Sequence, residues 1–120
     1  HNLRIIDKIL VSSTRLIANV NSYQDTWKKK KIDNLSLLLK AALEADRKVG
    51  LMMNVEEKNL EKVLKVLPSM KSPTVAKLHN SQWISVTTVI DEKIVRKLIP
   101  ELKDAGASGI VEYPLNKVVE

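Results

Sequence analysis

After residue 48 the chain contains two copies of one pattern, a strand followed by a helix and another strand. This repeat constrains the fold more than any other feature. Each helical stretch places leucine, isoleucine and valine at i, i+3 and i+4 spacing. Pro68 ends the first helix and Gly106 ends the second. The predicted strands are residues 49–54, 74–78, 83–90 and 109–113, and the predicted helices are residues 57–67 and 92–104.

The starts of the two helices support the same repeat, because acidic residues stabilise a helix N-terminus through the helix dipole. The acidic pairs are Glu56-Glu57 in the first copy and Asp91-Glu92 in the second. The order β-α-β-β-α-β predicts an α+β, ferredoxin-like domain over residues 49–120, with an antiparallel sheet and both helices on one face. Pro100 lies inside the second helix, where a proline removes a hydrogen bond, so we expect a kink or an early end there.

The chain before residue 49 follows different patterns. Residues 24–48 have helical apolar spacing, with Asp25 as the N-cap, and we interpret them as a connector helix that leads into the domain. Residues 1–23 contain two short β-like stretches, at 4–11 and 14–20, without an apolar partner in the chain. A two-stranded pair is marginally stable in water. We therefore expect residues 3–23 to be disordered, or ordered only against another copy or a neighbouring molecule.

Composition excludes several classes of protein. The 120 residues, 44% of them apolar, are enough for one compact domain. No apolar run approaches the ~20 residues of a membrane span and no signal-peptide pattern is present, so we expect a cytoplasmic protein without a membrane partner. The lack of cysteine excludes disulfides, thiolate metal sites and a cysteine nucleophile.

The net charge of +6 raises the question of an acidic partner such as a nucleic acid. Much of the excess comes from the run Lys28 to Lys31, which is typical of a solvated helix face. Two Trp, two Tyr and no Phe offer little material for stacking bases. We therefore do not expect nucleic acid as a partner.

No residue pattern predicts catalysis or metal binding. His1 and His79 are not spaced with carboxylates as a metal site requires. The three glycines do not form a Gly-rich phosphate loop. We predict no catalytic residue, no metal ligand and no cofactor in this chain.

Three short segments are candidates for binding a small ligand. In residues 71–74, Ser72 and Thr74 flank a proline and offer hydroxyl groups, although a turn that enters a strand also explains them. In residues 105–109, small side chains let backbone N–H groups approach an anion, although a helix C-cap and a tight turn have the same composition. Asn54 ends an apolar strand, where it alternatively caps the next helix. When two copies bring such connections together, they would form an amino-acid site.

Five short segments, in this order along the chain, carry a resemblance to a known family. They are Leu51-Met52-Met53-Asn54-Val55, Val66-Leu67-Pro68, Lys71-Ser72-Pro73-Thr74-Val75, Trp83-Ile84-Ser85-Val86 and the stretch from Leu102 to Ile110. Together they resemble the C-terminal regulatory domain of long-form ATP phosphoribosyltransferase, the first enzyme of histidine biosynthesis. Residues 5–19 resemble the last strands of that family's catalytic lobe, so the span 1–23 would be a remnant of that lobe.

The resemblance implies a regulatory function. In that family the C-terminal domain binds histidine between subunits as a feedback inhibitor, and the enzyme assembles as dimers or as less active hexamers. Carried over by residue, the histidine pocket would involve Asn54, Met70, Ser72, Thr74 and Gly109, with Ala107 and Ser108 nearby. The residues that bind ATP and phosphoribosyl pyrophosphate would lie upstream, so this chain should not catalyse the transfer. Magnesium is implied for the parent enzyme and no cofactor for this fragment.

Two other functions remain open for this fold. A ferredoxin-like RNA-binding module is consistent with the positive charge but not with the lack of exposed aromatic residues on the middle strands. A purely structural oligomerisation domain would share the fold and bind no amino acid. Calorimetric titration with histidine, beside other amino acids, distinguishes these alternatives.

Overall fold

A computed structural model describes residues 3–68, 72–79 and 81–119, so the predicted site residue Met70 lies outside the described residues. By its internal contacts the chain divides into two compact units, His1–Ser36 and Leu37–Glu120. Each unit is considered by itself.

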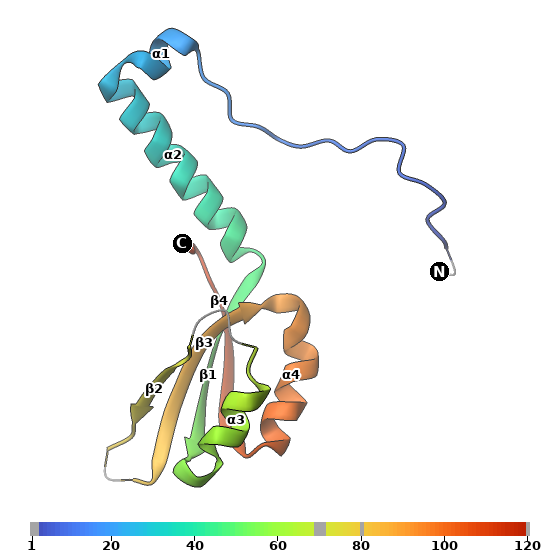
Figure 1. The fold of residues 1–120 in the computed structure, drawn as a ribbon, viewed down its shortest axis with the longest axis vertical. Helices are drawn as coiled ribbons and strands as arrows, with labels where there is room; N and C mark the ends of the chain where they lie inside the picture. The colour runs from blue at the N-terminus through green and yellow to red at the C-terminus, as the bar shows by residue number, and fades with distance from the viewer. Residues whose placement is uncertain (1–2, 69–71, 80, 120) are drawn as a thin grey trace. The chain divides into compact units, whose positions relative to one another are not determined.

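The second unit contains one four-stranded sheet and the helices that cover it. Its elements are β1 (Lys48–Glu56), a 3-10 turn η1 (Glu57–Asn59), α3 (Leu60–Val66), β2 (Thr74–Lys77), β3 (Trp83–Asp91), α4 (Glu92–Asp104) and β4 (Ala107–Pro114). The strand order is β2-β3-β1-β4, and every pair of neighbours is antiparallel. The two strands of each strand–helix–strand repeat are therefore not neighbours, because a central strand of the other repeat lies between them. Both helices lie on one face of the sheet (Figure 1). The predicted α+β, ferredoxin-like fold is confirmed.

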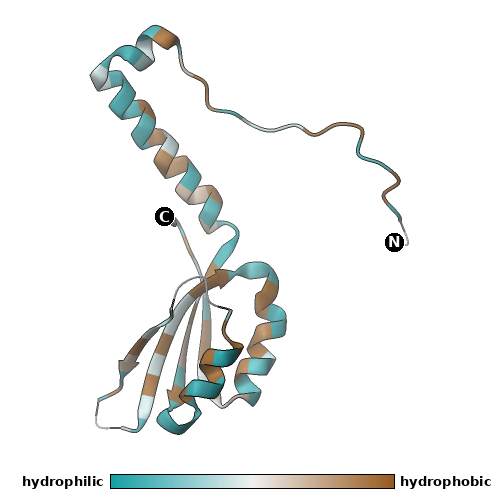
Figure 2. Ribbon diagram, viewed as in Figure 1, coloured by the Kyte–Doolittle hydropathy of each residue, from teal (hydrophilic) through white to brown (hydrophobic). Residues whose placement is uncertain are grey.

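Alternation of side chains along the central strands separates the two faces of the sheet, because successive residues of a strand point to opposite sides. Figure 2 shows this alternation along β3 as brown and pale bands. Ile84, Val86 and Ile90 are buried beneath the helices, whereas Ser85 and Thr87 between them are only half-buried. One face of the sheet therefore belongs to the core, and we call the other the open face.

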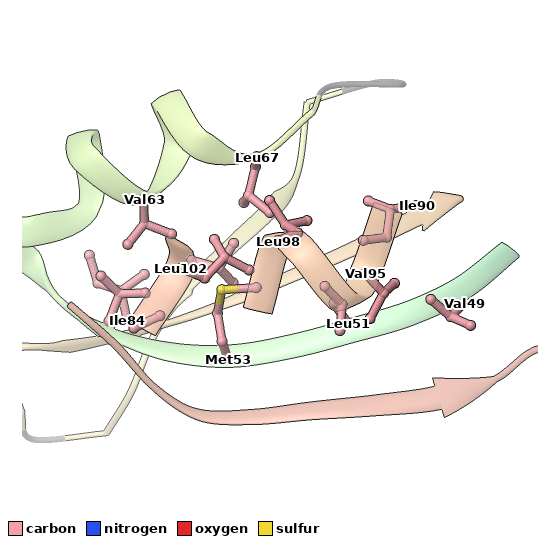
Figure 3. Close-up of a cluster of buried hydrophobic side chains, with 13 residues drawn as sticks. Val49, Leu51, Met53, Val63, Leu67, Ile84, Ile90, Val95, Leu98 and Leu102 are labelled. Carbon is pink, nitrogen blue, oxygen red and sulfur yellow. The ribbon is translucent and has the colours of Figure 1, made fainter. Parts of the chain in front are cut away.

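The hydrophobic core lies between the inner face of the sheet and the two helices (Figure 3). Leu51, Met53 and Val55 of β1 have no exposed surface, and they pack with Val63 of α3 and Leu102 of α4. Full burial of each such side chain stabilises the folded state by about 1.5–3 kcal/mol. This core fixes the positions of the strands relative to one another, and with them the positions of the strand ends and loops.

Helix α4 continues through Pro100 to Asp104, so the early end expected there is not observed. Leu98 and Leu102, on either side of the proline, are both buried in the core. Burial of these two side chains holds the last turn of the helix in place despite the missing backbone hydrogen bond.

The first unit differs from its expected secondary structure. Residues 3–19 form neither helix nor strand, so the two short strands expected at 4–11 and 14–20 are not formed. A β-like sequence needs a partner strand and a surface that covers its apolar side, and within the described residues neither stretch pairs with a strand. Helix α1 (Val20–Gln24) follows instead.

Helix α2 (Thr26–Ala45) begins in the first unit and ends in the second, and it covers most of the span expected for the connector. Asp25 caps its N-terminus, because its Oδ1 accepts a hydrogen bond of 2.9 Å from the backbone N–H of Lys28. In the described part of the chain, no helix combines the length and the hydropathy that crossing a bilayer requires.

Candidate ligand-binding site

The open face of the sheet carries the residues that the core does not use. Directly opposed residues of an antiparallel pair lie on the same face of the sheet. The strand register therefore gives the side chains that are neighbours on the open face. One row across the sheet consists of Ala76, Ser85, Asn54 and Ser108, and the next consists of Thr74, Thr87, Met52 and Val111. These side chains are small, polar or apolar, and none is charged.

Three predicted site residues come together near the edge of the sheet that β4 forms. Asn54 of β1 lies opposite Ser108 of β4. A Cβ added to the neighbouring Gly109 would lie 3.6 Å from Nδ2 of Asn54. The amide of Asn54, the hydroxyl of Ser108 and the backbone of Gly109 are therefore neighbours on the sheet.

A β-bulge produces this arrangement. The register of β1 with β4 shifts between Met52 and Asn54, so that two residues of β4, Gly109 and Ile110, face Met53 alone. Gly109 has φ +56°, in the left-handed region that glycine adopts readily, as the first residue of such a bulge often does. Because a bulge interrupts the ladder of hydrogen bonds, it leaves backbone groups available to a ligand.

The side chain of Ala107 belongs to the core and not to the open face. It is 2% exposed and lies opposite Val55, so its methyl group belongs to the hydrophobic core. Only the backbone of this residue is in a position to contact a ligand on the open face. The role predicted for segment 105–109 was also a backbone role, so the place of Ala107 near the ligand stays a prediction.

Thr74 and Ser72 lie at the opposite edge of the sheet. Thr74 is the exposed first residue of β2 and faces Thr87, and Ser72 is exposed just before the strand. Strands β3 and β1 separate β2 from β4, so Thr74 is about three strand spacings, roughly 14 Å, from Ser108. Within one chain the predicted residues therefore form two separate groups.

Sequence reasoning did not identify the contribution of Gly50 and Tyr113. They face each other across β1 and β4, and the Tyr113 ring covers Gly50 so closely that a Cβ at this position would overlap the ring. The sequence did contain a sign of this contact, because a glycine inside a predicted strand often marks the close approach of another group. Tyr113 forms part of the open face together with Met52 and Val111, whose side chains are also exposed.

The chemistry of this face favours binding over catalysis. The two rows described above contain hydroxyl, amide and apolar groups, which orient a ligand but do not transfer protons at neutral pH. Within residues 3–68, 72–79 and 81–119, no group of three or more His, Cys, Asp or Glu side chains is arranged to hold a metal ion. His79, the one histidine in these ranges, is exposed next to β2.

Comparison with known proteins identifies the family. The sequence model described as "HisG, C-terminal domain" matches residues 45–117, which include the whole sheet together with α3 and α4. A protein named ATP phosphoribosyltransferase from Thermodesulfovibrio yellowstonii is 53% identical over 119 residues, covering 99% of this chain and 41% of that protein.

Proteins of the same name from Chlorobium luteolum and Koribacter versatilis are 50% and 51% identical over 120 and 119 residues, and each is again covered to 41% of its length. The chain therefore spans about two fifths of the length of the curated relatives it matches. The family match extends over more than half of the chain and over every element of the ferredoxin-like sheet. The chain belongs to the family of HisG C-terminal domains.

Proposed function

We propose that this chain is the regulatory part of an ATP phosphoribosyltransferase and that it binds histidine between subunits as a feedback inhibitor. The relatives that match it over its whole length carry that enzyme's name, and it covers about two fifths of each. The observation that carries the proposal is the pair of uncharged rows on the open face, with Ser108 of β4 at one edge of the sheet and Thr74 of β2 at the other. Catalysis, with ATP, phosphoribosyl pyrophosphate and magnesium, belongs in this proposal to the remaining three fifths of the enzyme, which acts in the cytoplasm.

Histidine is a zwitterion at neutral pH, so its site must offer donors to the carboxylate and acceptors to the ammonium group. Backbone N–H groups at the bulge around Gly109 suit the carboxylate, and the amide oxygen of Asn54 suits the ammonium group. Because these protein groups are neutral, the site itself buries no protein charge that lacks a partner. The arrangement supports an amino-acid ligand better than a phosphorylated one.

The separation of Thr74 from Ser108 supports a site between subunits. Roughly 14 Å is more than one amino acid spans, so a single copy does not bring both groups to one ligand. A second copy that places its β2 edge beside the β4 edge of the first would supply the hydroxyl of Thr74. In this arrangement histidine stabilises one assembly, a dimer or a hexamer, over another, and a ligand shifts such an equilibrium only through its difference in affinity.

The test is histidine inhibition of the complete enzyme together with calorimetric titration. Thr74→Val removes one hydroxyl and leaves its ligand partner unpaired, which should weaken binding by about 1–3 kcal/mol, or roughly 5- to 150-fold. Thr88→Val is the matched control, because Thr88 faces Leu51 on the inner side of the sheet. Uninhibited turnover should stay nearly unchanged in both variants. Unchanged inhibition in Thr74→Val and in Gly109→Val would contradict the assignment of this site.

A second function is supported by the apolar part of the open face. Met52, Val89 and Val111 are each more than a third exposed there, which suits a module that only holds subunits together. Such a module would assemble identically with and without histidine. Titration calorimetry with histidine, beside other amino acids, separates the two functions, since heat of binding specific to histidine supports only the first.

A further inference from the structure

Lys48 is buried at the start of β1, where the connector helix meets the sheet. It is 4% exposed, and within residues 3–68, 72–79 and 81–119 no other charged or polar residue is buried. Its Nζ lies 2.8 Å from Oε1 of Glu44, one helical turn earlier in α2. Removing a lysine from water is costly unless it is paired, so this contact is a specific feature of the junction.

Other contacts join the end of α2 to the same sheet domain. Ala41 and Ala45 are each 3% exposed, and the backbone N–H of Val118 donates a hydrogen bond of 3.0 Å to the carbonyl oxygen of Ala41. The carbonyl oxygen of Arg47 accepts one of 3.0 Å from the N–H of Glu92 at the start of α4. The last turns of α2, from Leu37 onward, therefore form one compact unit with the sheet.

Strand β1 connects this junction with the candidate ligand site. Asn54 lies six residues after Lys48, about 20 Å along the same strand. β1 is a central strand, paired with β3 over its full length and with β4 at both ends. A shift of the strand at the ligand site would therefore reach its other end, because rigid secondary elements are among the structures that carry coupling between distant sites.

We infer that the Glu44–Lys48 ion pair couples histidine binding at the open face to the orientation of α2, and through α2 to the part of the enzyme that precedes the regulatory domain. The family match begins at residue 45, so most of α2 lies outside the C-terminal domain proper. Lys48 is a positioning residue in this scheme and does not contact the ligand. The inference rests on the proposed function.

An ion pair suits this role better than an apolar contact. A hydrogen-bonded pair fixes one relative position of helix and strand, whereas apolar side chains of similar volume tolerate sliding. Replacing both charges by apolar residues is often neutral or stabilising for a fold. Loss of the pair should therefore weaken coupling without unfolding the domain.

The experiment uses the complete enzyme and compares Lys48→Met and the double variant Glu44→Met/Lys48→Met with the unmodified protein. Histidine affinity is measured by calorimetry, and inhibition and uninhibited turnover are measured by assay. We expect the histidine affinity of both variants to stay within about twofold of that of the unmodified enzyme, and their uninhibited turnover to stay near it. Inhibition by histidine should be weakened about fivefold or more, which is the lower end of typical allosteric coupling. Lys58→Met is the matched control, since it removes an exposed lysine that pairs with Glu56.

Inhibition equal to that of the unmodified enzyme in the double variant would overturn the inference, whether or not Lys48→Met folds. Loss of histidine binding together with inhibition would also overturn it, because Lys48 would then support the site itself. An unmodified enzyme that binds no histidine would instead refute the proposed function, and the inference with it. Retained binding with weakened inhibition is the outcome that supports coupling.

Discussion

Substitution of Gly109 tests whether the bulge requires the left-handed backbone. The residue has φ +56°, and a Cβ there would meet only Nδ2 of Asn54, at an ordinary contact distance of 3.6 Å. The cost of a side chain therefore comes from the backbone. Gly109→Ala should lose about 1–2 kcal/mol of folding free energy, and Gly109→Val up to about 3 kcal/mol because a branched side chain fits this region poorly. Gly109→Asn should lose the least, since asparagine visits the left-handed region most readily.

The assay is thermal and urea unfolding of the chain, followed by circular dichroism. For a domain of this size each kcal/mol lowers the melting temperature by about 4 °C. Gly106→Ala is a useful comparison, because Gly106 has φ +102° and its Cβ would lie 2.7 Å from Nδ2 of Asn59, so strain and overlap add. Equal losses for Gly109→Asn and Gly109→Val would refute the backbone argument, because the two differ mainly in their tolerance of positive φ.

Two further predictions concern the core and the connector helix. Met53→Ala should lower the free energy of unfolding, measured in urea, by about 2–5 kcal/mol, because Met53 has no exposed surface. Met52→Ala should cost much less, because Met52 lies on the open face and is 43% exposed. Similar losses would contradict the assignment of the two faces. The hydrogen bond of 3.1 Å to Asp33, and then its charge, raise the pKa of Lys29 above 10.5. The stabilising effect of the pair is therefore present below pH 10.5 and lost as the pH rises through the raised pKa. In an NMR titration, Asp33→Asn should return the pKa of Lys29 toward 10.5. An unchanged titration would count against the pairing.

Much of the fold was predictable because its determinants are local. The strand expected at 83–90 is observed as Trp83–Asp91, since alternation of apolar and polar residues is itself the property that places one face in the core. The second helix was predicted from its apolar spacing and ends one turn after Pro100, where burial of Leu102 outweighs the proline. The stretches at 4–11 and 14–20 have the same local β-like character, yet they form no strand, because strand formation depends on a partner.

The sequence by itself determined the order of strands and helices, the apolar faces of the two helices and the family resemblance, all of which depend on periodicity and short motifs. Only the tertiary structure decided which candidate residues are neighbours. The bulge at Gly109 brings Ser108 beside Asn54, and the strand order β2-β3-β1-β4 places Thr74 at the far edge. The burial of Lys48 against Glu44 is likewise visible only in the fold. Register, strand order and burial are set by contacts between residues distant in sequence, and no local pattern encodes them.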